Sequence, residues 1–321
     1  MALKTDYKDY IPPSGGRKYK ITANSDGSSS VEDITQYQQV GDTWGAEDIN
    51  QVNKLVNGAV YPNLLDNSDF TNPVNQRGDS VFDTNGYCID RWQVFESTYD
   101  TTTRTVTADD VAGTYGSQFR QIIDTNLLSE NDTVSVSAYV NNTIYKFTKT
   151  ISLYTGSILD APYDLETSWG GFKIILLAHR PKVFFVMFLK PSQKITVNWA
   201  KLERGTSVTP YTPKGYGVEM AKCLRYYYQV SSVRTFGQQH TGAGTYVNVI
   251  LPQVMRVTPT VSAPGEWTIR FNGMDKKATV SSVGSLNGNT LNLTMSTIAG
   301  GTYIGPLYAF YDGKITFSAD L

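Results

Sequence analysis

The sequence predicts a mainly β protein with an N-terminal arm and short helix, then a β-sandwich or jelly roll, and then a second, smaller β-sandwich domain. Short runs of β-branched and aromatic residues alternate with turn clusters from residue 63 to residue 321. Charged residues make up only 18% of the chain, against about 25% in ordinary soluble proteins, and 21 of the 321 residues are Tyr. A convincing helical periodicity extends over residues 44–59 alone. We therefore divide the chain into residues 1–62, 63–213 and 214–321.

Residues 1–44 have the composition of an attachment arm. Two clusters at residues 12–16 and 24–30 are rich in Pro, Gly, Ser and Asn, which form turns. Between them, Lys18–Thr22 is expected to form one short strand. Apolar residues are too sparse to bury much surface, so we expect this arm to become ordered against a partner. The N-terminus shows no apolar h-region, so a secretory signal peptide is not expected.

Residues 44–59 are predicted to form a helix, which Asp42 or Thr43 can cap. Acidic residues at positions 47 and 48 fall in its first turn, where the helix dipole favours negative charge. Its apolar residues recur at spacings of 3, 4 and 3, which is typical of a coiled-coil seam. The seam consists of Ile49, Val52, Val56 and Ala59. We expect it to mediate homo-oligomerisation; the alternative is a single helix packed on the next domain.

Residues 63–213 contain the short, evenly spaced strand patterns of one sandwich or jelly roll. Thr133–Val140 alternates strictly between polar and apolar residues. Lys194–Leu202 also alternates, which places Ile195, Val197, Trp199 and Lys201 on one face. Trp92 and Trp199 are expected to lie in the core. Phe172–Leu189 is interpreted as two buried strands joined by a turn, because its charges and its proline exclude a membrane span.

Residues 214–321 show a second series of strands. Val218–Tyr228 is expected to be a short helix or an extended lead-in. Asn287-Gly288 and Asp312-Gly313 predict hairpin turns, because these residues tolerate positive φ. The predicted strands are Tyr246–Leu251, Thr260–Ser262, Trp267–Phe271, Ala278–Val283, Thr290–Met295, Tyr303–Tyr311 and Lys314–Ala319.

The formal charge of −1 conceals a difference between segments. Residues 64–221 have 14 Lys and Arg against 17 Asp and Glu, a net charge of −3. Residues 222–321 have 8 against 4, a net charge of +4. The near-neutral total does not favour nucleic acid or membrane insertion, whereas the basic C-terminal segment favours an anionic partner.

Catalytic and metal-binding motifs are scarce. The two His, at positions 179 and 240, are too far apart for a ligand pair, and Cys88 and Cys223 are expected to be free thiols. We find no nucleophile elbow, phosphate-binding loop or dinucleotide fingerprint, so no enzymatic activity is expected. The remaining enzymatic alternative is a glycoside hydrolase that uses Asp160, Asp164 and Glu166 in a cleft.

Oxygen-rich residues at positions 66–72 offer one cofactor hypothesis. Asp66 and Asp69, with Asn67 and Asn72 nearby, are candidate ligands for a structural Ca²⁺. The alternative is a cluster of Asx turns that hydrogen-bond the local backbone. No other cofactor is expected.

Aromatic residues are the main candidates for ligand binding, since sugar rings pack on exposed aromatic faces. The candidates from loops and C-terminal strands are Tyr163, Trp169, Trp267, Tyr303 and Tyr308. For the two tryptophans the alternative is a structural role.

Three stretches resemble phage tail-fibre or receptor-binding proteins. The first stretch is Gly41–Asn53. The second opens with Asn63–Gly78 and Asp90–Trp92 and closes with Trp199–Tyr211. The third comprises Cys223–Gln229, Leu251–Thr260 and Phe317–Leu321. The resemblance implies a carbohydrate-binding-like jelly roll over residues 63–213 and a β tip domain over residues 214–321. It also implies a homotrimer that attaches through its N-terminus to a tail or baseplate protein, with the distal domain touching the host surface.

We therefore expect a tail-fibre protein, made in the host cytoplasm and located in the virion tail of a bacteriophage or phage-like particle. Its expected role is host adhesion through a cell-surface polysaccharide. The alternatives are a glycan depolymerase of a tail spike, a purely structural tail or baseplate component, and a free-standing carbohydrate-binding module.

Overall fold

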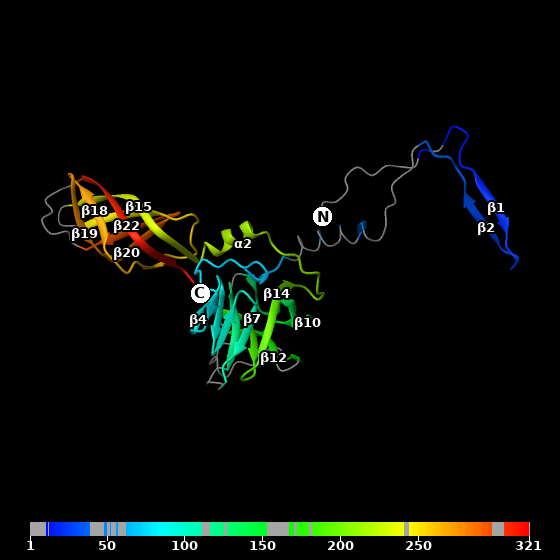
Figure 1. Ribbon diagram of the computed structural model, residues 1–321, viewed down its shortest axis with the longest axis horizontal. Coiled ribbons are helices and arrows are strands. Elements are labelled where there is room, and N and C mark those ends of the chain that lie inside the picture. The colour runs from blue at the N-terminus through cyan, green and yellow to red at the C-terminus, as the bar shows by residue number, and fades with distance from the viewer. Residues whose placement is uncertain are drawn as a thin grey trace. The chain divides into compact units, whose positions relative to one another are not determined.

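The computed structural model describes residues 11, 13–38, 48, 49, 52, 56, 62–110, 116–124, 127–152, 167–169, 172–179, 182–240, 244–296 and 305–320. The chain separates into two compact units, residues 1–62 and 63–321 (Figure 1). The second unit has two main hydrophobic cores, one in residues 63–213 (the sandwich) and one in residues 214–321 (the C-terminal module). Most described residues of both lie in antiparallel strands, so the predicted mainly β fold is confirmed.

The first unit contains a hairpin of two strands, β1 (Tyr19–Ala23) and β2 (Ser29–Asp33). The predicted strand Lys18–Thr22 matches β1, whereas the sequence does not predict β2, because SSVED is mostly polar. Asp26 Oδ1 accepts a hydrogen bond from Ser28 N at 2.9 Å and so closes the turn. Every residue of both strands is exposed.

The predicted helix over residues 44–59 is described at four positions, 48, 49, 52 and 56, and all four are helical. Two seam residues present apolar side chains to solvent, since Ile49 is 45% exposed and Val56 is 51% exposed. Val52 is half-buried, and Ala59 lies outside the described residues.

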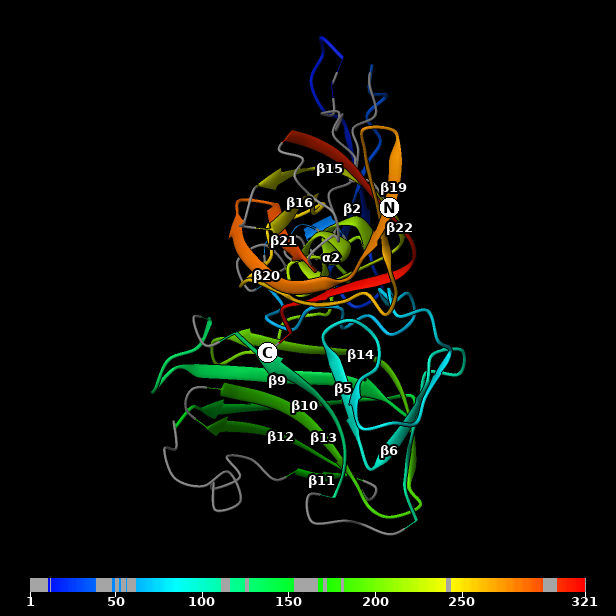
Figure 2. The same ribbon diagram turned by 90° about the vertical axis from the view of Figure 1, so that its left-hand side faces the viewer.

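The sandwich consists of two six-stranded antiparallel sheets (Figures 1 and 2). The first has the order β10-β9-β14-β7-β6-β3, where the strands are β3 (Val81–Phe82), β6 (Ser97–Asp100), β7 (Thr105–Ala108), β9 (Thr133–Val140), β10 (Thr143–Thr150) and β14 (Lys194–Arg204). The second has the order β11-β12-β13-β8-β5-β4, where the strands are β4 (Gly86–Tyr87), β5 (Trp92–Phe95), β8 (Ser117–Ile123), β11 (Thr167–Trp169), β12 (Phe172–His179) and β13 (Lys182–Leu189).

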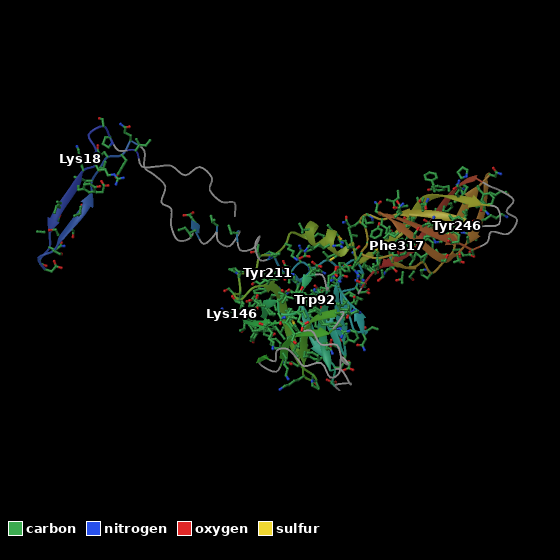
Figure 3. The ribbon with its side chains drawn as sticks, turned by 180° about the vertical axis from the view of Figure 1, so that it is seen from behind. Lys18, Trp92, Lys146, Tyr211, Tyr246 and Phe317 are labelled. Carbon is green, nitrogen blue, oxygen red and sulfur yellow. The ribbon has the colours of Figure 1, made fainter. Side chains whose placement is uncertain are left out.

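The core of the sandwich is centred on Trp92, whose side chain is fully buried (Figure 3). Its ring stacks on Phe119 with centroids 4.7 Å apart and meets Phe70 edge-on at 4.9 Å. Such ring pairs add about 0.5–1.5 kcal/mol to the stabilisation from apolar burial. The prediction that Trp92 lies in the core is confirmed.

A β-bulge in β14 changes which of its side chains face the core. Its pairing with β9 shifts between Val197 and Trp199, so Asn198 is an extra residue in this strand. The expectation that Trp199 and Lys201 continue the core-facing row is therefore wrong: Trp199 is half-buried and stacks on Tyr211 at 4.6 Å. The apolar residues that β14 buries in the core are Ile195, Val197, Ala200 and Leu202.

The C-terminal module begins with helix α2 (Tyr216–Cys223), so of the two alternatives for Val218–Tyr228 the short helix is present, although it ends at Cys223 and Tyr227 already begins β15. Its eight strands form one sheet with the order β19-β18-β22-β15-β16-β21-β20, in which β17 also pairs with β22, and Figure 2 shows this sheet curling around its own core. The strands are β15 (Tyr227–His240), β16 (Gly244–Ile250), β17 (Thr260–Ser262), β18 (Trp267–Phe271), β19 (Met274–Ala278), β20 (Val280–Asn287), β21 (Thr290–Met295) and β22 (Gly305–Ser318).

Two hairpin turns were expected in this module, and one of them is present. Gly288, with φ of +59°, lies in the turn that joins β20 to β21. Asp312-Gly313 instead lies inside β22, opposite a register shift between Val230 and Ser232 of β15. The expected turn is wrong here because a β-bulge accommodates these residues without ending the strand.

The sandwich and the C-terminal module meet at a buried contact that we call the joint. At its centre, Asn67 has a positive φ of +51° and a side chain that is 1% exposed. Its Oδ1 accepts from Val74 N at 2.7 Å, and its Nδ2 donates to Val74 O and Asp90 O at 2.8 Å each. Its backbone N–H donates to Glu219 Oε2 on α2 at 2.9 Å. One asparagine thus connects the start of the sandwich to the first helix of the C-terminal module.

Two arginines of the sandwich complete the joint. Arg77 Nη2 lies 2.9 Å from Asp320 Oδ2, and the guanidinium carbon of Arg77 lies 3.9 Å from the ring centroid of Tyr227. Arg91 lies 3.5 Å from the ring centroid of Tyr226. The two cation–π contacts join the sandwich to the start of β15, and the ion pair with Asp320 joins it to the end of the C-terminal module.

We predict that Asn67→Ala lowers the free energy of unfolding by about 3–5 kcal/mol, because it removes three buried hydrogen bonds and places alanine at positive φ. Urea unfolding followed by tryptophan fluorescence measures this difference. Asn72→Ala, at an exposed position five residues away, serves as the matched control and should change stability by less than about 0.5 kcal/mol. Equal effects of the two substitutions would contradict the assignment of Asn67 as the centre of the joint.

Candidate functional site

The structure separates the aromatic residues that the sequence singled out. Tyr163 and Tyr303 lie outside the described residues, as do the acidic residues of the hydrolase alternative. The backbone of Trp169 lies in β11, but its side chain is outside the described part. Trp267 is fully buried and packs against Tyr311 at 5.3 Å, so the expectation that it binds ligand is wrong: alternation along β18 turns it into the core.

Tyr308 belongs to a cluster of rings and guanidinium groups on the outer face of the C-terminal sheet. We call this cluster the aromatic patch; it consists of Arg234, Phe236, Arg270, Tyr308 and Phe310. Three neighbouring strands bring these residues together, because Phe236 lies opposite Tyr308, and Arg270 of β18 pairs with Tyr308 from the other side.

The patch presents apolar ring surface to solvent. Phe236 is 72% exposed, and its ring centroid lies 5.5 Å from that of Tyr308. Tyr308 in turn contacts Phe310 at 5.9 Å. A phenylalanine that is nearly three-quarters exposed gains little from folding, so its position among other rings is typical of a binding surface.

Two arginines border the rings and are held by carboxylates. Arg270 forms a bidentate pair with Asp275 at 2.6 and 2.7 Å, and Arg234 pairs with Asp312. Their guanidinium carbons lie 5.5 and 5.1 Å from the Phe310 ring centroid, respectively. The patch therefore combines flat apolar faces with positioned hydrogen-bond donors, which are the two requirements for stacking and orienting a sugar.

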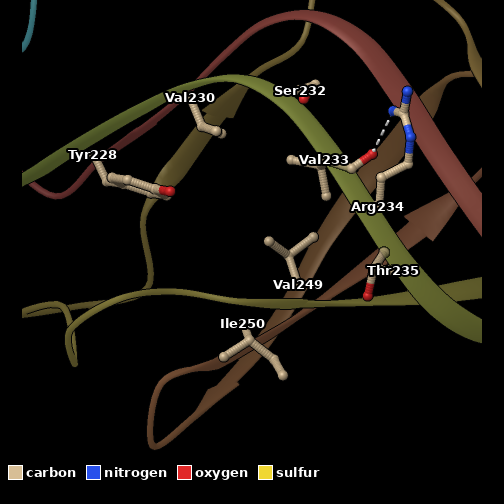
Figure 4. Close-up of a pocket in the computed structure, with 8 residues that line it drawn as sticks. All are labelled: Tyr228, Val230, Ser232, Val233, Arg234, Thr235, Val249 and Ile250. Atoms are coloured by element: carbon tan, nitrogen blue, oxygen red, sulfur yellow. Dashed lines mark hydrogen bonds between the residues drawn. The ribbon is translucent and has the colours of Figure 1, made fainter.

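A groove of mixed polar and apolar lining lies beside the patch, where β15 and β16 separate (Figure 4). The two strands pair only from Gly237–His240 to Gly244–Val247, although β16 continues to Ile250. The resulting pocket has a volume of ≈ 210 Å³. Its lining residues are both apolar and polar: Tyr228, Val230, Ser232, Val233, Arg234, Thr235, Val249 and Ile250. Arg234 lines this groove and belongs to the patch as well, so the two features share one residue.

Sequence reasoning found one of the five patch residues, Tyr308. Alternation along β22 also places Phe310 on the outer face, since Leu307 and Ala309 are buried while Tyr308 and Phe310 are not. The missing information was strand order, because residues 234–236, 270 and 308–310 meet only when β15, β22 and β18 are neighbours.

The candidate calcium ligands have other partners in the structure. The Asp66 carboxylate lies 3.6 Å from Arg91, 3.7 Å from Lys214 and 3.2 Å from Lys222. Burial opposes ionisation of Asp66, but the three cations together hold its pKa below the usual value. Asp69 Oδ1 accepts from Thr71 N at 3.0 Å, an Asx turn as in the alternative interpretation. Among the described residues, no group of three or more His, Cys, Asp or Glu could hold a metal ion.

A second carboxylate of the joint has the opposite pKa shift. Asp90 accepts from Gln76 N at 2.7 Å and lies 3.4 Å from Arg77. Its burial raises its pKa to about 6, against the opposing effect of these partners. Asp320, which shares Arg77, also has a pKa raised by burial.

The two cysteines are free, as predicted, and both are buried. Burial raises the pKa of Cys88 to about 12 and that of Cys223 well above its usual value. Thiols that stay protonated are poor nucleophiles.

Comparison with known proteins adds no relatives: no family model matches the chain, and no curated protein matches its sequence. In the part of the chain that the structure describes, no helix is long and apolar enough to cross a membrane.

Asp90 predicts a specific pH dependence of stability. The pKa of Asp90 is about 6 in the folded state, whereas an unfolded aspartate has a pKa near 4. Between pH 4 and pH 6, folding therefore takes up a proton, and the free energy of unfolding should fall as the pH rises through this range. For a difference of about 2 units the fall is about 3 kcal/mol. Asp320 acts with the same sign, whereas Asp66 acts in the opposite sense and only below pH 4.

The measurement is urea unfolding at pH values from 4 to 7. Asp90→Asn removes this titration and should flatten the decrease, because the variant side chain stays neutral throughout. Asp79→Asn changes the charge equally at an exposed position and should retain the decrease. A decrease that persists in full in Asp90→Asn would contradict this assignment.

Proposed function

We propose that the protein is an adhesive tail-fibre protein of a phage or phage-like particle and that its C-terminal module binds a host cell-surface glycan through the aromatic patch. The observation that carries this proposal is the exposed ring of Phe236 in contact with Tyr308, bordered by two arginines. The proposed role is binding and not catalysis, and the proposed location is the virion tail.

The chemistry of the patch supports a saccharide ligand. The C–H faces of pyranose rings pack on aromatic rings, while guanidinium groups donate hydrogen bonds to hydroxyl or anionic oxygens. The net charge of +4 in residues 222–321 favours encounter with anionic cell-wall polymers and predicts weaker adhesion at high salt.

The exposed seam supports self-association of the helix. Ile49 and Val56 lie on helical backbone with about half of each side chain in solvent, and a short isolated helix is marginal in water. Packing of the seam against copies of itself would bury these side chains. We propose a homotrimer, the state that the tail-fibre resemblance implies.

The hairpin of the first unit supports attachment to another protein. Tyr19, Ile21 and Val31 share one face of this hairpin and are 51%, 71% and 64% exposed. A two-stranded hairpin is marginally stable alone, so a covering partner would stabilise it. We propose a tail or baseplate protein as that partner, with the sandwich acting as the connecting module.

We predict that Phe236→Ala combined with Tyr308→Ala weakens binding to host cells by about tenfold or more, because two stacking rings are lost. Fluorescently labelled full-length protein titrated onto whole cells measures this change. Tyr216→Ala removes another exposed ring, 45% accessible at the start of α2, and should leave binding intact. Unchanged binding in the double variant would exclude the patch as the adhesive surface.

We further predict that Ile49→Asp combined with Val56→Asp converts a trimer into monomers, because a buried seam does not tolerate unpaired carboxylates. Sedimentation equilibrium of the full chain measures the mass. Ile144→Asp, at a position 58% exposed on the edge strand β10, controls for an added surface charge and should remain trimeric. A monomeric wild-type chain would overturn the proposed trimer.

A further inference from the structure

Arg120 has an unusual environment on the outer face of the second sandwich sheet. It lies on β8 between Phe119 and Gln121, whose side chains are buried on the inner side of the sheet. Its cross-strand neighbours are Gln93 on β5 and Val186 on β13. The residue thus occupies the middle of a sheet face that lies far in sequence from the aromatic patch.

Four neighbours hold the guanidinium group of Arg120 in one place. Its Nε donates to Gln93 Oε1 at 3.0 Å, and its Nη1 donates to Gln118 Oε1 at 3.2 Å. Its central carbon lies 3.8 Å from the ring centroid of Phe95 and 5.2 Å from that of Phe184. These contacts use two of the five N–H bonds and leave donors on both Nη1 and Nη2.

No carboxylate compensates this charge among the residues that the structure describes: the ion pairs of the sandwich involve Arg77, Arg91, Lys201 and Arg204. Burial lowers the pKa of Arg120 to about 10, and only Tyr87 acts in the opposite direction. A partly buried, unpaired guanidinium is unfavourable for the folded chain, and a bound anion would remove that penalty.

We propose that Arg120 is the anion-binding group of a second ligand site, which takes an acidic group carried by a glycan. The two terminal nitrogens can form the paired hydrogen bonds that arginine makes to a carboxylate or a phosphate. Because the amide oxygen of Gln93 accepts from Arg120, its Nε2 is left to donate to the same ligand. The half-exposed ring of Phe95 supplies an apolar face beside it.

This site is independent of the proposed adhesive role of the C-terminal module. It uses β5 and β8 of the sandwich, whereas the aromatic patch uses β15, β18 and β22. Loss of one site therefore leaves the other in place, and the Phe236→Ala, Tyr308→Ala protein should bind acidic saccharides through Arg120 as the wild type does.

The test is a calorimetric titration of the full-length protein at low salt with three probes: trigalacturonate, a glycerol phosphate oligomer and neutral galactotriose. The first two distinguish a carboxylate from a phosphate as the source of the charge. We expect one of them to bind at least about tenfold more tightly than galactotriose, since charge-assisted bidentate bonds are the strong ones. Arg120→Gln and Arg120→Lys should each weaken that binding by about tenfold or more, because neither retains the planar fork.

Arg204→Gln is the matched control, because it removes the same charge from an exposed arginine that pairs with Asp132 elsewhere on the sandwich. It should bind the acidic probe within about twofold of wild type. Thermal unfolding provides a second readout: the acidic probe should raise the midpoint of the wild type and of Arg204→Gln and leave that of Arg120→Lys unchanged. Failure of both acidic probes to bind, or equal binding by the Arg120 variants, would overturn the proposal.

Discussion

The reversal of the chain at Asp66 and Asn67 is the constraint on which the rest of the second unit depends. Trp92 Nε1 donates to Asp66 O at 3.2 Å and to Asn67 O at 2.9 Å, so the central ring of the sandwich core is anchored to this turn. The Asn67 side chain closes the loop to Val74, and its backbone N–H reaches Glu219. One left-handed residue therefore positions a core tryptophan, a loop and the first helix of the next module. Asparagine is suited to this place because it tolerates positive φ and carries both a donor and an acceptor.

Among the residues that the structure describes, most buried charges belong to this joint. Asp66, Asp90 and Asp320 face Arg77, Arg91, Lys214 and Lys222, and nearly all of these groups are withdrawn from water. Such pairs contribute little net stability, because desolvation offsets much of their attraction. Breaking one is costly, however, so the network favours a single arrangement of the opening segment, α2 and the C-terminal residues. Asp66, Arg77, Asp90, Arg91 and Asp320 of this network lie within the stretches on which the resemblance to tail-fibre proteins rests.

The two proposed recognition surfaces differ in their chemistry. The aromatic patch offers exposed rings with arginines that already have carboxylate partners, so it suits neutral sugar faces with polar edges. Arg120 offers a positioned cation between two rings, so it suits an acidic substituent. If the protein uses both proposed sites, its ligand would need a sugar surface and a negative charge. Weak contacts of this kind would gain strength if the proposed trimer presented three copies of each site.

The sequence by itself determined the mainly β class, the helical positions near residue 50, the core position of Trp92 and the turn at Gly288, because periodicity and turn chemistry are local properties. Tertiary structure decided the rest. The bulge at Asn198 turned Trp199 away from the core, and a second bulge kept Asp312-Gly313 inside a strand. Phe236, Arg270 and Tyr308 became neighbours only through the order of β15, β22 and β18. Strand order and bulge position depend on which distant segments pair, and no local pattern in the chain contains that information.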